Sequence, residues 1–144
     1  MERKDIGKAG EQEEKDAWIE NGYLYMTYKD ETWGSCRHWQ TVCSLKEVES
    51  EDHARAIIDN KENSFKACWE FEVVKKEFND SRRNRHRHCI YRAKLETGKT
   101  YLLRIYKKVH PSCNRLKWYR KFTYYLISDA ENMKLMEDRT VEGI

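Results

Sequence analysis

Aromatic side chains at alternating positions are the residues of this chain best suited to chemistry, and that chemistry is binding. In Phe65–Val73, apolar or aromatic residues alternate with polar ones, as in a strand with one buried face. In a small barrel, such strands place bulky rings inside, where they form either a packed core or the walls of a ligand cup. The candidate rings are Trp39, Trp69, Phe71, Tyr91, Tyr101 and Trp118.

The basic run Arg82–His88 is a second candidate. Clustered guanidinium groups bind phosphates or sulfated glycans. The other interpretation is a solvated strand end, since acidic segments elsewhere balance the run and no aromatic residue interrupts it to stack on bases. The run supports an alternative function, a non-enzymatic interaction module that binds a protein or an anionic glycan.

Catalytic and metal-binding patterns are missing from the sequence. It has no glycine-rich phosphate loop and no serine or cysteine in a nucleophile-elbow context. It has no Cys-x2-Cys pair, and cations crowd His86 and His88. We therefore expect no enzyme activity, no cofactor and no metal.

Composition predicts one folded domain. The chain has 144 residues, of which 37% are charged, 39% apolar and 12% aromatic. Its net charge of +3 is too small to indicate a nucleic-acid-binding protein. No apolar run is long enough to span a bilayer. We expect residues 1–20 to form an arm with a short helix, and residues 21–144 to form the domain.

Five cysteines lie in the middle of the chain, at positions 36, 43, 68, 89 and 113. Their placement in predicted strands and turns favours one or two disulfides in a secreted domain. If residues 89–108 form a hairpin about Gly98, Cys89 faces the residues just before Cys113, so these two could form a disulfide. The pairing of Cys36, Cys43 and Cys68 stays open.

Strand-period segments fill most of the chain, and their number predicts an all-β, eight-stranded antiparallel barrel. Asn21-Gly22 is taken as the cap of the N-terminal helix. Ala54–Ile58 is either a strand or a helical turn, and Lys117–Ile127 is either a strand or a helix. The other predicted strands are Tyr23–Tyr28, His38–Val48, Phe65–Phe78, a segment from the basic run to Leu95, Thr100–Lys108 and Met133–Met136.

Short motifs in the N-terminal third resemble the tick salivary histamine-binding lipocalins. These motifs are Asp16-Ala17-Trp18, the tyrosine-rich Tyr23–Lys29 and Thr32-Trp33-Gly34. The stretch from Cys89 to Cys113 also resembles the disulfide-closed last hairpin of that family. The resemblance implies a secreted, monomeric lipocalin that sequesters a host inflammatory mediator, and it covers about 35 residues.

The amine-binding members of that family carry two carboxylates where this chain has Ile90 and Leu102. Their register would turn His88, Ile90, Arg92, Leu102 and Arg104 inward, giving a basic pocket suited to an eicosanoid or a fatty acid. Hydrophobicity instead predicts that Tyr91, Ala93, Leu95, Tyr101, Leu103 and Ile105 point inward. In that register an amine such as histamine or serotonin needs an acid from elsewhere, for which Glu70 and Asp30 are candidates.

Overall fold

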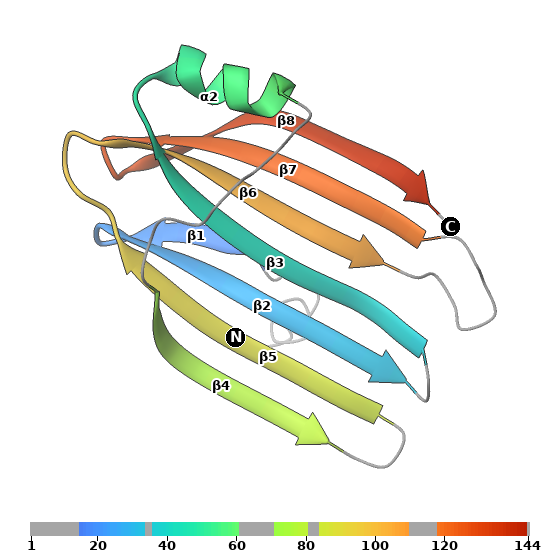
Figure 1. The fold of residues 1–144 in the computed structure, drawn as a ribbon. Helices are drawn as coiled ribbons and strands as arrows, with labels where there is room; N and C mark the ends of the chain where they lie inside the picture. The colour runs from blue at the N-terminus through green and yellow to red at the C-terminus, as the bar shows by residue number, and fades with distance from the viewer. Residues whose placement is uncertain (1–14, 34–35, 61–70, 81–83, 110–117, 144) are drawn as a thin grey trace, which may run out of the picture.

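The computed structural model describes residues 15–33, 36–60, 71–80, 84–109 and 118–143. They form one antiparallel sheet of eight strands and one short helix (Figure 1). The elements in chain order are β1 (Ala17–Glu20), β2 (Tyr23–Trp33), β3 (Cys36–Val48), α2 (Glu51–Asp59), β4 (Glu72–Asp80), β5 (Asn84–Lys94), β6 (Thr100–Val109), β7 (Trp118–Ser128) and β8 (Asn132–Gly143). The mainly β content is as predicted.

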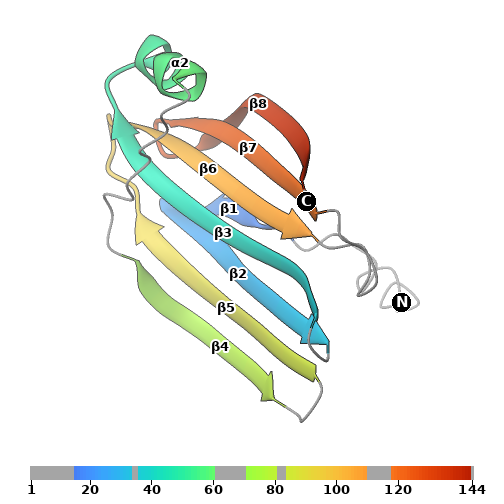
Figure 2. The ribbon, with the colours of Figure 1, turned by 45° about the vertical axis from the view of Figure 1, so that its right-hand side comes forward.

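The sheet of described strands is open, not the closed barrel predicted. Its order is β4-β5-β2-β3-β6-β7-β8, with β1 paired to β2, so that β4 and β8 are edges. Figures 1 and 2 show these two strands at opposite ends of the twisted sheet. Because neighbouring strands along this path alternate in direction, β4 and β8 point the same way. They therefore could not complete an all-antiparallel wall by pairing with each other.

The predicted hairpin about Gly98 is wrong. Strand β5 pairs with β2 and β4, whereas β6 pairs with β3 and β7, so β2 and β3 lie between them. Gly98 does take the positive φ expected of it, +86°. The turn chemistry was thus recognised correctly, but it says nothing about which strands pair afterwards. Cys89 is a buried free thiol, so the predicted disulfide is not formed, and Cys113 lies outside the described residues.

The predicted N-terminal helix is also wrong, because Ala17–Glu20 is strand β1. It pairs with Tyr23–Met26 across Asn21 and Gly22, whose φ angles are +52° and +79°. Two consecutive positive φ angles define the tight hairpin turn that Asn-Gly favours. The same dipeptide can end a helix, and four residues are too few for hydrophobic period to separate the two structures.

The segment that was ambiguous around Ala54 is helix α2. Its first turn is capped by Ser50, whose Oγ accepts a hydrogen bond from the His53 N–H at 3.1 Å. The other ambiguous segment is strand β7, and β8 is longer than predicted. Strand β4 begins at Glu72 and ends at Asp80, two residues beyond the predicted end at Phe78, while residues 65–70 lie outside the described part.

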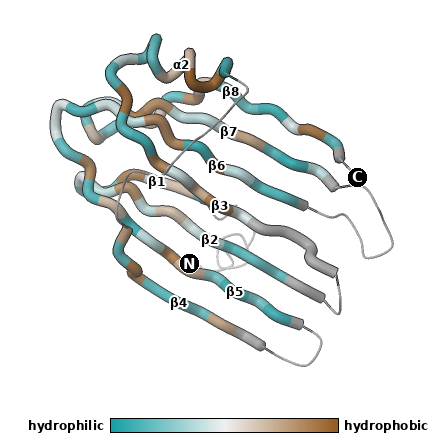
Figure 3. The backbone as a smooth tube through the Cα atoms, in the orientation of Figure 1, coloured by the Kyte–Doolittle hydropathy of each residue, from teal (hydrophilic) through white to brown (hydrophobic). Residues whose placement is uncertain are grey.

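Two hydrophobic cores lie on opposite faces of the sheet. On the outer face, α2 packs Ala54 and Ile58 against Val48, Leu102 and Tyr124. The inner face carries the larger cluster: Ala17, Leu24, Met26, Leu45, Ala93, Leu95, Tyr101, Leu103, Ile105 and Ile127. In Figure 3, hydrophobic residues gather near α2, while the residues at the opposite ends of β5 and β6 are hydrophilic.

Candidate functional site

A cleft of about 790 Å³ opens on the inner face, between β1 and strands β6, β7 and β8. The cleft exists because β3 pairs with only the Lys29–Trp33 end of β2. The rest of β3 pairs with β6, and at the other end of β2 the strand β1 pairs with Tyr23–Met26 in its place. The described residues that line it are Lys15, Asp16, Ala17, Trp18, Ile19, Ile105, Lys107, Lys121, Thr123, Tyr125, Glu131, Met133 and Asp138. Its volume is that of a small-molecule site.

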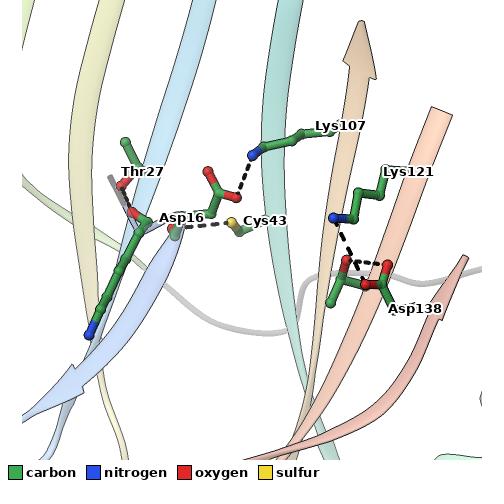
Figure 4. A network of polar contacts seen from close by, with 8 residues as sticks. Asp16, Thr27, Cys43, Lys107, Lys121 and Asp138 are labelled. Atoms are coloured by element: carbon green, nitrogen blue, oxygen red, sulfur yellow. Dashed lines mark hydrogen bonds and ion pairs between the residues drawn. The ribbon is translucent and has the colours of Figure 1, made fainter. Parts of the chain in front are cut away.

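Two ion pairs organise the polar side of the cleft (Figure 4). Lys107 and Lys121 are directly opposite each other on β6 and β7, where like charges repel. Each lysine has its own carboxylate: Lys107 Nζ lies 2.8 Å from Asp16 Oδ2, and Lys121 Nζ lies 3.8 Å from Asp138 Oδ2. Thr123 Oγ1 also donates to Asp138 Oδ1 at 3.2 Å.

The backbone of β2 and a thiol of β3 fix the start of β1. The Thr27 N–H donates to the Asp16 carbonyl at 2.8 Å, and Thr27 Oγ1 donates to the Lys15 carbonyl at 3.0 Å. The Cys43 thiol also donates to the Asp16 carbonyl, with Sγ 3.8 Å from the oxygen. Asp16 Oδ1 is buried and has no hydrogen-bond partner among the described residues. An orphaned carboxylate oxygen is an acceptor available to a donor on a ligand.

Two protonatable groups near the ion pairs, the thiol of Cys43 and the phenol of Tyr125, remain neutral at physiological pH. Burial, and then the charge of Asp16, raises the pKa of Cys43 to about 12. Burial also raises the pKa of Tyr125, with smaller contributions from Asp138 and Asp16. Because a thiol, not a thiolate, contacts Asp16, Cys43 serves as a weak donor and not as a nucleophile.

A smaller hollow of about 320 Å³ adjoins the cleft at Cys43. It contains two predicted ligand-binding residues, Phe71 and Tyr91. The described residues that line it are Met26, Thr27, Tyr28, Val42, Cys43, Phe71 and Tyr91. This hollow is mostly apolar and has no ion pair among the residues that line it, so it offers shape and rings but no fixed charge.

Most other predicted site residues lie elsewhere. Tyr101 and Leu103 are fully buried in the inner core and do not line the cleft, and the Tyr101 hydroxyl accepts the Glu96 N–H at 3.0 Å. The side chains of Trp39, Trp69 and Trp118 are outside the described part of the structure.

The inner face has the register that hydrophobicity predicts and not the one that the resemblance implies. Leu102 lies in the outer core beside Tyr124, its diagonal neighbour on β7, and Arg104 shares that face. On β5, Arg92 binds Glu72 at 2.7 Å and stacks over Tyr23, and His88 contacts Glu77 at 3.2 Å. None of Arg104, Arg92 and His88 lines the cleft.

The basic run is divided between two faces. Residues of a strand alternate, so Arg85 and Arg87 point to one face of β5 while His86 and His88 point to the other. Arg87 lies over the exposed ring of Phe78, 5.9 Å from its centre. The run therefore does not form one cationic surface within the described residues, and residues 81–83 lie outside them.

Sequence reasoning missed the charged residues of the cleft, although alternation held a signal. Lys107 is in phase with inward Leu103 and Ile105, and Lys121 with inward Tyr125. Of the two acids proposed for an amine, Glu70 is outside the described part, and Asp30 is buried but does not line the cleft. The acidic residues that line the cleft are Asp16, Glu131 and Asp138.

Comparison of the chain with family models, curated proteins and solved structures found no match. No helix among the described residues is long and apolar enough to cross a membrane. Within the same residues, no group of three or more histidine, cysteine, aspartate or glutamate side chains could hold a metal ion.

Proposed function

We propose that this chain is a non-enzymatic carrier that sequesters a small molecule in the cleft between β1 and strands β6–β8. The observation that carries the proposal is the combination of size and lining. The cleft of about 790 Å³ is lined by six charged side chains and by the apolar side chains of Ala17, Ile19, Ile105 and Met133. Its size is that of a small-molecule site, and its charged groups can set the orientation of a ligand that itself carries charge.

The ligand class that this lining favours bears an ammonium group. Asp16, just before β1, and Asp138, on β8, both line the cleft, and one Asp16 oxygen has no hydrogen-bond partner among the described residues. An anionic lipid has less support, since Arg92 and Arg104 do not line the cleft, and Lys107 and Lys121, which do, are already paired with carboxylates. The biogenic amines histamine and serotonin, which the resemblance implies, belong to the favoured class.

The finer parts of the proposal rest on the sequence motifs. From the resemblance of these motifs, we propose that the chain is a secreted, monomeric lipocalin that removes a host inflammatory mediator. The supporting feature of the fold is coarse: a twisted antiparallel sheet with a ligand-sized cleft on its inner face.

Isothermal titration calorimetry with histamine, serotonin, tryptamine and a leukotriene tests the proposal. We expect one amine to bind with one-to-one stoichiometry, and Asp138→Asn to weaken it by about tenfold, the worth of one charge-assisted hydrogen bond. Asp59→Asn on exposed α2 is the matched control and should bind as the parent does. Equal loss in both variants, or no binding by any amine, would count against the cleft as an amine site.

A further inference from the structure

The basic and acidic side chains that line the cleft are equal in number, and this balance narrows the class of ligand that the cleft can bind. The inference rests on the proposed function. Three lysines and three acidic residues line it among the described residues: Lys15, Lys107, Lys121, Asp16, Glu131 and Asp138. A ligand that enters must compete with ion pairs already present. Its own charges therefore decide whether any charge of the protein is left without a partner.

Of the two ion pairs, Lys121–Asp138 is the one that a ligand can open. Its atoms are 3.8 Å apart, and its side chains are 48% and 40% exposed. The Lys107–Asp16 pair is shorter, at 2.8 Å, and Asp16 is only 18% exposed. The Asp16 carbonyl is also held by Thr27 and Cys43. Lys121 and Asp138 are therefore the exchangeable partners and Lys107–Asp16 is the fixed wall.

An ammonium ligand that binds Asp138 displaces Lys121, whose charge then lies beside Lys107, directly opposite on β6. A carboxylate ligand that binds Lys121 leaves Asp138 without its cation. A ligand with both groups replaces one ion pair with two and leaves no charge unpaired. We propose that the natural ligand is a zwitterion with an apolar body, whose ammonium group binds Asp138 and whose acid group binds Lys121.

The rest of the cleft fits such a ligand. Ile105, Tyr125 and Met133 provide apolar surface on the same face as the charges. Asp16 Oδ1 has no hydrogen-bond partner among the described residues, and Lys107 lies directly opposite Lys121, so a second acceptor and a second cation line the same cleft. Amino acids with large side chains, and conjugates that retain both charges, make up this class.

Three probes with the same ring separate the charges: tryptophan, tryptamine and indole-3-propionate. In calorimetry on the whole chain, we expect tryptophan to bind about tenfold more tightly than either single-charge analogue. Asp138→Asn should remove the advantage of tryptophan over indole-3-propionate, and Lys121→Gln its advantage over tryptamine. Lys76→Gln and Asp59→Asn, exposed and outside the cleft, should leave all three affinities unchanged.

The outcomes separate this inference from the proposed function. If tryptamine binds the parent protein as tightly as tryptophan, the zwitterion inference is wrong and the carrier proposal stands. If none of the three probes binds, both are overturned. The parent comparison needs no substitution, so it decides the question even if a variant fails to fold. For folded variants, an unchanged ranking of the probes would also overturn the assignment of the two groups.

Discussion

Replacing Lys107 with methionine should lower the free energy of unfolding by about 1–2 kcal/mol. The substitution leaves the Asp16 carboxylate, whose side chain is only 18% exposed, without the ammonium group that lies 2.8 Å away. Breaking a fully buried pair costs about 3–5 kcal/mol. Two features reduce that figure here: Lys107 is 36% exposed, and its removal relieves repulsion with Lys121 across the β6–β7 ladder.

Urea unfolding followed by circular dichroism measures this loss. The double-mutant cycle with Asp16→Asn isolates the pair, and we expect a coupling of about 1 kcal/mol. The matched control is Lys121→Met, whose longer and more exposed pair should contribute less than about 0.5 kcal/mol. A coupling between residues 16 and 107 no larger than that of the control pair would refute the view of Asp16–Lys107 as a fixed wall.

Three further predictions concern the thiol, the core and the first turn. The pKa of Cys43 is raised from 9.0 to about 12 in the folded chain. The contribution of the protonated thiol to the free energy of unfolding should therefore be complete below pH 9 and lost as the pH rises toward 12. Cys43→Ala should flatten that part of the curve of unfolding free energy against pH. Leu103→Ala should cost about 2–5 kcal/mol in urea unfolding, whereas exposed Leu135→Ala should stay within about 0.5 kcal/mol. Gly22→Ala should lower the free energy of unfolding by about 1 kcal/mol, because φ at this position is +79°. An added Cβ would meet no atom within 4 Å, so backbone strain is the whole of the expected cost. A cost near zero in urea unfolding would contradict the turn assignment.

Local pattern was sufficient to predict most of the strands and, through hydrophobicity, the inward faces of β5 and β6. The alternation through Tyr91, Ala93 and Leu95, and through Tyr101, Leu103 and Ile105, matches the inner core. A strand shows this pattern regardless of its neighbours, because side chains on a pleated backbone alternate by geometry alone. The same alternation places Lys107 on the inner face, although its bound carboxylate could not be inferred.

Local pattern failed where one signal suits two structures. Asn21-Gly22 takes positive φ in either a helix cap or a tight hairpin, and only the pairing of Ala17–Glu20 with β2 separates them. Gly98 likewise marks a turn, but it does not determine which strands pair with each other in the sheet. The error at Gly98 carried through to the predicted Cys89–Cys113 disulfide, because that prediction assumed neighbouring strands.

The sequence by itself determined the β class, and hydrophobic period indicated the inward faces of β5 and β6, since both follow from local pattern along the chain. Among the described residues the buried core is mainly aliphatic, with Tyr101 and Tyr124 as its aromatic members. Tertiary structure alone decided that β2 and β3 lie between β5 and β6, and that the sheet stays open between β4 and β8. It also brought Asp16 to Lys107, 91 positions later in the chain. Strand pairing depends on contacts between distant residues, and no local pattern encodes those.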